Sequence, residues 1–306
     1  MKNTKIDWCD ASFNPISGCY HTCKYCYARK IAERFRLRDS EKQMYELNVP
    51  VLRRDKDDKP VKSAYPYGFT PTFFRYRLDE LKDWKKPMNI FVGSMADMWG
   101  DWVPDDWKIE VLKTLAKNPQ HNYLFLTKNP FGYSIWATKD NPTFDDVGCY
   151  TSNMWLGVTY TGTERYQPEK YNPLYKYAQL SINTNFLYLH RMSETITPTK
   201  GAHKFISIEP LLCDICEVED ERDGGKLLEN FLFPRGYKSY FEWVIVGAET
   251  GCRRGKVIPK REWLEKLVDI CKRANVPLFM KESLANVWGE PLIQEFPKEL
   301  KKDGDE

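Results

Sequence analysis

Three cysteines near the N-terminus, Cys19, Cys23 and Cys26, have the most specific chemistry in this chain. They form a Cys-x3-Cys-x2-Cys pattern, so one short loop can present three thiolates. A four-iron cluster normally takes four cysteine ligands, and three local thiolates would leave one iron open. The spacing therefore predicts an iron–sulfur site whose open iron can bind a second ligand.

Two other kinds of cysteine site compete with the cluster. Zinc sites generally use paired Cys-x2-Cys units and need four ligands. His21 could supply the fourth ligand, although it lies between two of the cysteines, where a tight loop would be strained. A disulfide framework is disfavoured, because nine cysteines are an odd number and we expect no secretory signal.

The elements that would position this loop are short apolar runs separated by helix-length intervals. Such runs are typical of strands buried on both faces of a parallel sheet. They cover residues 89–94, 123–127, 155–159, 204–209, 243–249 and 276–281. Amphipathic patterns predict helices over 105–117 and 260–274, and residues 13–17 would form a first strand directly before the cysteines. The alternation indicates an α/β fold built from βα units.

Polar residues follow nearly every predicted strand. In a barrel of parallel strands the carboxyl ends share one face, and active sites form there. Glu209 and Glu249 end two otherwise apolar strands and could orient a substrate or move protons. A salt bridge with Lys281 or Arg253 is the competing interpretation of these carboxylates.

Composition sets the broad class. The chain has 306 residues, 42% hydrophobic and 29% charged, which suits a globular protein, and α/β barrels of this length are often single domains. We expect one domain over 1–306, a rim insertion over 40–86, irregular loops or insertions over 138–152 and 214–240, and a charged tail over 298–306. No stretch approaches the ~20 apolar residues of a membrane span. We therefore expect a cytoplasmic protein with no membrane contact, in a compartment that keeps thiols reduced.

Beyond the cysteine spacing, several segments resemble a known family. The triplet, with Tyr25 before its last cysteine, is similar to the signature of the radical S-adenosylmethionine (SAM) enzymes. Further blocks resemble those of an uncharacterised, phage-associated radical-SAM-like family, a domain of unknown function. They are Ile6–Trp8 with Phe13–Pro15, Cys26–Ala28, Gly93–Met98, Leu126–Lys128, Leu156–Thr159, Ser207–Leu212 and Trp243–Gly251. The resemblance implies a partial (β/α)6 TIM-like barrel of the radical SAM type with rim insertions.

In that superfamily, SAM chelates the open iron of a 4Fe-4S cluster. One-electron reduction then cleaves SAM to methionine and a 5'-deoxyadenosyl radical, which abstracts hydrogen from a substrate. The resemblance implies that Cys19, Cys23 and Cys26 bind the cluster and that Tyr25 contacts the adenine.

The same resemblance implies a set of residues around SAM at the strand ends. Ser94 or Asp97 would bind the amino group, although many radical SAM proteins carry Gly-Gly-Glu at this place. Thr127 and Lys128 follow the next strand, and the Lys128 ammonium is a suitable partner for the SAM carboxylate. Thr159 and Thr161 could bind the ribose. The candidate catalytic residues are Lys128, Glu209 and Glu249.

The sequence leaves the substrate open. A nucleic acid or modified nucleoside is favoured by the phage association, by a general likeness to radical enzymes that repair spore DNA photoproducts, and by abundant aromatic residues. Basic residues point the same way, namely Arg34, Arg36, Arg38, Arg75 and Arg77, whereas a net charge of only +3 argues against it. The expected reductant is a ferredoxin or flavodoxin.

The alternatives are a peptide or metabolite substrate, an iron–sulfur electron-transfer module without SAM cleavage, and a zinc-stabilised nucleic-acid-binding protein. Cys213, Cys216 and Cys252 could hold an auxiliary cluster, but buried free cysteines are common.

Overall fold

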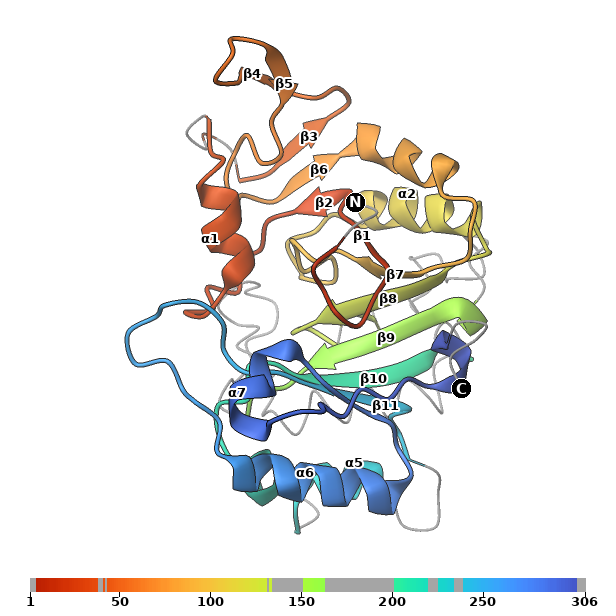
Figure 1. Ribbon diagram of the computed structural model, residues 1–306. Coiled ribbons are helices and arrows are strands. Elements are labelled where there is room, and N and C mark those ends of the chain that lie inside the picture. The colour runs from red at the N-terminus through yellow and green to blue at the C-terminus, as the bar shows by residue number, and fades with distance from the viewer. Residues whose placement is uncertain are drawn as a thin grey trace, which may run out of the picture.

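The chain is built around one curled sheet of seven parallel strands, as in a partial barrel (Figure 1). This computed structural model describes residues 4–37, 41, 43–130, 132–133, 151–162, 201–219, 225–233 and 239–301. The strands are β1 (Ala11–Phe13), β7 (Asn89–Val92), β8 (Asn122–Thr127), β9 (Met154–Thr159), β10 (His203–Ile208), β11 (Trp243–Val246) and β12 (Leu278–Met280). Their order in the sheet follows the chain, and each neighbouring pair is parallel.

The six predicted apolar runs are all strands of this sheet. β7, β11 and β12 are buried along their whole length, which explains why their sequences do not alternate. The predicted first strand over 13–17 is wrong at both ends, because β1 covers Ala11–Phe13 and β2 (Ile16–Ser17) belongs to another sheet. Pro15 lies between them, and proline has no N–H to continue a ladder.

Helices connect the strands where the structure describes the connections. α2 (Asp105–Ala116) and α6 (Arg261–Ala274) confirm the two predicted helices. α5 (Leu227–Leu232) lies in a stretch predicted to be irregular, and that prediction is wrong there. The helix packs into the core, where four of its side chains are buried. The connections over 134–150 and 163–200, which include most of the predicted loop 138–152, lie outside the described residues. The (β/α)6 count therefore stays a prediction.

A smaller sheet lies beside the first strands of the main sheet, close to α1 (Tyr27–Glu33) (Figure 1). Its strands are β2, β6 (Thr72–Phe74) and β3 (Tyr45–Leu47), and a hairpin of β4 (Leu52–Arg54) and β5 (Pro60–Lys62) follows β3. A 3-10 helix over Arg75–Asp83 then returns the chain to β7. The elements from β3 to this 3-10 helix occupy the stretch predicted to be a rim insertion.

Both ends of the described chain pack on the face of the main sheet opposite the helices. Trp8 contacts Phe91 and Trp243, with ring centroids 4.7 and 6.3 Å apart. Leu300 is buried in the same cluster, and its carbonyl accepts a hydrogen bond of 2.8 Å from Asn89 Nδ2. The predicted charged tail thus begins as a packed 3-10 turn over Lys298–Leu300.

Helix length and hydropathy bear on the membrane prediction. In the described part of the chain, no helix is long and apolar enough to cross a bilayer.

Candidate functional site

A cavity of about 410 Å³ opens at the carboxyl edge of the seven-stranded sheet. The loop after β1 and β2 lines it, and so does the end of every later strand of this sheet. The lining includes all of the predicted site residues except Thr161, namely Cys19, Cys23, Tyr25, Cys26, Ser94, Asp97, Thr127, Lys128, Thr159, Glu209 and Glu249. Thr161 is buried outside this lining. The expected convergence of strand ends is confirmed, whereas the roles of the residues stay proposals.

The cysteine loop is seated between two neighbouring segments by backbone hydrogen bonds. The N–H of Gly18 donates to the carbonyl of Met95 at 2.9 Å, and the N–H of Cys19 donates to that of Phe69 at 3.4 Å. Gly18 has a φ of +90°, and a Cβ there would lie 2.5 Å from backbone atoms of Thr70 and Pro71. Glycine is therefore required where the loop begins.

The three thiols are half-buried and line the same cavity. The sulfur of Cys19 accepts a hydrogen bond from the N–H of His21 at 3.4 Å, and the sulfur of Cys26 caps α1 by accepting from the N–H of Arg29 at 3.3 Å. Burial raises the pKa of the Cys19 thiol well above its ordinary value, and the nearby Asp97 carboxylate raises it further. Metal binding would displace that proton, because the thiolate is the ligand.

The donor set fits an iron–sulfur cluster. Three thiols from one loop reach one cavity, and backbone N–H groups already donate to two of the sulfurs, as is usual around such clusters. Within the described ranges, no three Cys, His, Asp or Glu side chains surround a single metal position. The fit therefore rests on residue type and on the shared cavity.

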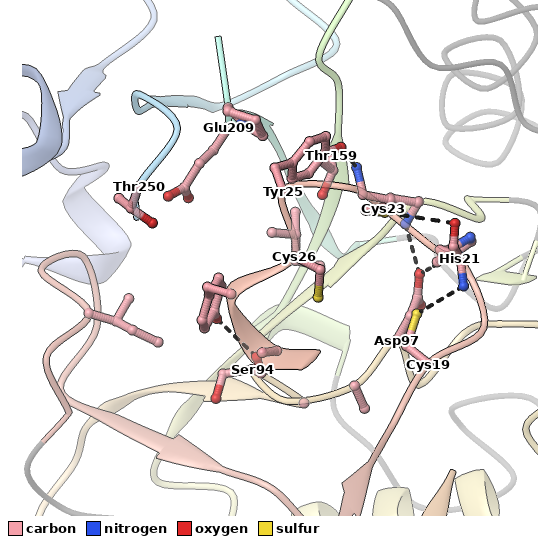
Figure 2. A pocket seen from close by; sticks show the side chains of 18 of the residues that line it. Cys19, His21, Cys23, Tyr25, Cys26, Ser94, Asp97, Thr159, Glu209 and Thr250 are labelled. Atoms are coloured by element: carbon pink, nitrogen blue, oxygen red, sulfur yellow. Dashed lines mark hydrogen bonds and ion pairs between the residues drawn. The ribbon is translucent and has the colours of Figure 1, made fainter. Parts of the chain in front are cut away.

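Asp97 connects the cysteine loop to the ends of β7 and β8. Its carboxylate accepts hydrogen bonds from four donors: His21 Nε2 at 2.7 Å, Thr127 Oγ1 at 2.7 Å, the Lys128 N–H at 2.9 Å and the Trp99 N–H at 3.1 Å. Burial alone would raise the pKa of Asp97, but the bonds from His21, Lys128 and Thr127 hold it below its ordinary value. Asp97 is a buried, ionised anchor for the loop, and Figure 2 shows it beside Cys19 and His21.

Ser94 and Tyr25 lie on other parts of the wall. Ser94 Oγ exchanges hydrogen bonds with the side chain of Asn14, which also accepts from the Met95 N–H at 3.0 Å. The Tyr25 hydroxyl accepts a hydrogen bond of 2.8 Å from Lys128 Nζ. This bond fixes the ring of Tyr25 over the cavity and places the Lys128 ammonium at its wall.

Glu209 and Glu249 each form a salt bridge, as the competing interpretation of the sequence predicted. Lys281 Nζ donates to Glu209 at 2.6 Å, and Arg253 donates to Glu249 through two bonds of 2.6 and 2.8 Å. The bonds from Arg253 lower the pKa of Glu249. A Cβ at Gly247 would approach Lys281 to 3.0 Å and Glu209 to 3.3 Å, so glycine leaves room for their pair. Figure 2 shows Glu209 near Thr250, on the side of the cavity away from Asp97.

Some functional candidates were missed from the sequence. Tyr27 lines the cavity and its hydroxyl donates to the Ser94 carbonyl at 3.0 Å. Phe69, from the inserted segment, and Lys5 and Ile6, from the start of the chain, also line it. Tyr27 and Ile6 lie within the sequence blocks that carry the family resemblance, and Lys5 precedes one of them. Phe69 lies near none of these blocks, so its place depends on the tertiary fold alone.

The basic residues first linked to nucleic acid are largely engaged within the protein. Arg36 pairs with Glu33 at 2.6 Å, and Arg75 pairs with Glu46 and Glu110. Arg77 donates to two backbone carbonyls. Arg38 lies outside the described residues. The contacts of Arg36, Arg75 and Arg77 help to hold α1 and the small sheet in place.

The three cysteines considered for an auxiliary cluster lie in different environments. Cys213 donates to the Thr161 carbonyl at 3.8 Å, Cys216 is buried with a pKa raised to about 12 by that burial, and Cys252 is exposed. They form no three-donor metal group in the part of the chain that the structure describes.

Comparisons with known proteins bear on the family. No curated protein matches the chain. Among solved structures, a cysteine-to-serine mutant of spore photoproduct lyase is similar, with a TM-score of 0.43 and 9% sequence identity over 94% of this chain and 78% of that one. The sequence profile of the family described as "Protein of unknown function (DUF5131)" matches residues 3–177 and 177–304. The chain therefore belongs to this family of unknown function.

Proposed function

We propose that this protein is a radical SAM enzyme. The observation that carries the proposal is the three-cysteine loop, which opens onto a cavity lined by the carboxyl ends of a parallel sheet. Active sites form at this edge in barrels of parallel strands. Cys19, Cys23 and Cys26 would hold a 4Fe-4S cluster there and leave one iron for SAM.

When bound, the reduced cluster and SAM supply methionine and a 5'-deoxyadenosyl radical that takes a hydrogen atom from the substrate. The protein's own residues bind and orient. Tyr25 would contact the adenine, and its bond to Lys128 holds the ring in place. Lys128 would neutralise the SAM carboxylate. Ser94 at the end of β7 and Thr159 at the end of β9 would bind the amino group and the ribose, respectively.

Asp97 has a different role in this proposal from the one expected from the sequence. Its oxygens already accept from four donors, including His21 and Thr127, so it would act by fixing the cysteine loop. Thr127 would support Asp97 in the same way, because its hydroxyl is buried against that carboxylate.

Glu209 with Lys281 would orient the substrate. Their pair is partly exposed on the cavity wall, with side-chain exposures of 24% and 18%, so a polar ligand can reach both charges. Glu249 is buried against Arg253 and would shape the wall. Ile6, Trp8 and Leu126 add apolar lining that keeps water from the radical chemistry.

The proposal also includes the cellular setting. A cytoplasmic location would keep the thiols reduced, and a ferredoxin or flavodoxin would supply the electron.

The test is mass-spectrometric detection of 5'-deoxyadenosine from anaerobically reconstituted protein given SAM and dithionite. Cys23→Ala should abolish the product, and Cys252→Ala, which changes an exposed thiol, should leave it unchanged. Iron-loaded protein that neither binds nor cleaves SAM would contradict the proposal and favour an electron-transfer module. Reconstituted protein that binds zinc and no iron would favour the zinc-stabilised alternative.

A further inference from the structure

Positive charge is concentrated in two segments that flank the cavity. Residues 23–37, with α1, contain five basic residues and one acidic residue, and residues 250–260, between β11 and α6, contain four basic residues and none that is acidic. Together the two segments carry eight net positive charges in a chain whose total is only +3. The remainder of the molecule is therefore net negative, and the small overall charge conceals a local basic surface.

The fold brings these two segments together at the cavity. Cys23, Tyr25, Cys26, Tyr27, Ala28 and Ile31 contribute to the lining from the first segment, and Thr250 contributes from the second. A Cβ placed on Gly251 would lie 3.9 Å from Lys30 Nζ, so α1 and the second segment are neighbours. In Figure 1 the loop between β11 and α6 extends toward the end of α1. We call five of the exposed cations of the two segments, Lys24, Lys30, Arg34, Arg254 and Lys256, the basic rim.

The basic rim differs from the other basic residues near the site. Arg36, Arg253, Lys128 and Lys281 each bond to a side chain of the protein. Among the residues that the structure describes, none of the five rim cations has an acidic partner within ion-pair distance. Exposed cations without internal partners are available to a polyanion.

Aromatic side chains accompany the rim. Tyr27, Lys30 and Arg34 are spaced i, i+3 and i+7, so they share one face of α1 and its C-terminal end. Tyr27 is 45% exposed, and Phe35 is 39% exposed just beyond the helix. The hydrogen bond from the Tyr27 hydroxyl to the Ser94 carbonyl holds that ring at the cavity. Exposed rings between cations are suited to stacking on unpaired bases.

We propose that the basic rim binds a single-stranded nucleic acid across the mouth of the cavity, so that the substrate class of the site is a polynucleotide. The identification of the bound strand as substrate rests on the proposed function. Phosphates would contact the cations of α1 and of residues 250–260, and an unpaired base would stack at Tyr27. A chain spanning the mouth could place one nucleotide in the cavity, as enzymes that act on bases must do.

The test measures binding of a fluorescein-labelled 20-nucleotide DNA strand, an RNA of the same sequence and the matching duplex to the full-length reconstituted protein by fluorescence anisotropy. Salt is varied from 50 to 200 mM. Lys30→Gln/Arg34→Gln and Arg254→Gln/Lys256→Gln should each weaken single-strand binding about tenfold or more at low salt. Each pair should also lower, by about 1.4, the magnitude of the slope of log binding constant against log salt concentration. Each phosphate contact on a single strand contributes about 0.7 to this slope.

The matched control is Lys113→Gln/Lys117→Gln, which removes two exposed lysines near the C-terminal end of α2 and should change neither quantity. Equal losses in the control, tighter binding of the duplex, equal competition by polyglutamate, or no binding at 50 mM salt would each overturn the proposal. The 5'-deoxyadenosine assay on the same preparation, without nucleic acid, separates the two claims. Binding without SAM cleavage contradicts only the radical SAM function, and cleavage without binding contradicts only the substrate class.

Discussion

His21 Nε2 lies 2.7 Å from Asp97 Oδ2, and this contact fastens the middle of the cysteine loop to the segment after β7. The ring of His21 also packs edge-on against Trp102 at 4.9 Å. Because Asp97 in turn accepts from Thr127 and Lys128 at the end of β8, one buried carboxylate sets the loop relative to two strand ends. The position of the thiols therefore depends on a residue 71 positions beyond Cys26 in the sequence.

Asp97→Asn tests this anchor. In Asp97→Asn, an NH2 group would replace one carboxylate oxygen and would face N–H and O–H donors instead of accepting from them. We therefore expect a loss of about 2–3 kcal/mol in the free energy of unfolding. We also expect less iron per chain after identical reconstitution. Urea unfolding and iron analysis measure the two effects. Asp79→Asn is the control, since Asp79 is largely exposed in a surface pair with Lys82; an Asp97 variant that behaves like it would refute the anchor.

Gly18→Ala tests how tightly the start of the loop is enclosed. Gly18 and Gly289 have nearly the same φ, +90° and +91°, but a Cβ meets backbone at 2.5 Å only at Gly18, and at Gly289 it meets nothing within 4 Å. The conformational cost of alanine should be about 1–2 kcal/mol at each position. The clash should add about 2 kcal/mol at Gly18 alone. Thermal or urea unfolding of both variants checks this difference, and equal losses would mean that the enclosure is not restrictive.

Lys128→Met tests the proposed SAM carboxylate partner. Loss of a charge-assisted hydrogen bond of ~1.4 kcal/mol should raise the Kd for SAM about tenfold. Tyr25→Phe removes the hydroxyl that positions Lys128 and should raise the Kd less. Equilibrium dialysis with labelled SAM gives these values, with Lys113→Met as the control. An unchanged Kd in Lys128→Met would remove this residue from the SAM site.

The pair of Glu249 and Arg253 gives a pH-dependent prediction. The pKa of Glu249 is lowered in the folded protein by the hydrogen bonds from Arg253, so its ionised form stabilises the fold above the unfolded value near 4.5. That contribution should be lost as pH falls from about 4.5 through the lower folded pKa. Wild-type protein should therefore lose more of its stability over this window than Glu249→Gln/Arg253→Gln does.

A double-mutant cycle on the same pair checks the role of burial. Arg253→Gln alone leaves a buried carboxylate without its partner and should lower the urea midpoint at pH 7 more than the double variant does. A double variant that is less stable than Arg253→Gln would contradict this expectation. It would show that the Glu249 carboxylate stabilises the fold even without Arg253.

Much of the site could be predicted from the sequence because of one geometric rule. Strands buried on both faces read as apolar runs, and the polar residues that end parallel strands meet at one edge. Asp97, Lys128, Thr159, Glu209 and Glu249 follow this rule, and all line the cavity.

What could not be predicted depends on tertiary pairing. The sequence shows that Asp97 is polar and near a strand end, but its four donors come from three separate segments. Likewise, the sequence does not show that Arg36 pairs with Glu33 whereas Arg34 stays exposed. The helix α5 was missed because it has only six residues, too few for a clear period.

The packing of Trp8 against Phe205 and Trp243 has a consequence for folding during synthesis. Neighbouring strands follow the chain order, so most of the sheet can assemble as it emerges. Trp8, however, must wait for partners made up to 235 residues later, and Cys26 is made 255 residues before Lys281 completes the cavity wall. The thiols of the nascent chain are thus accessible to solvent before the walls of the cavity exist.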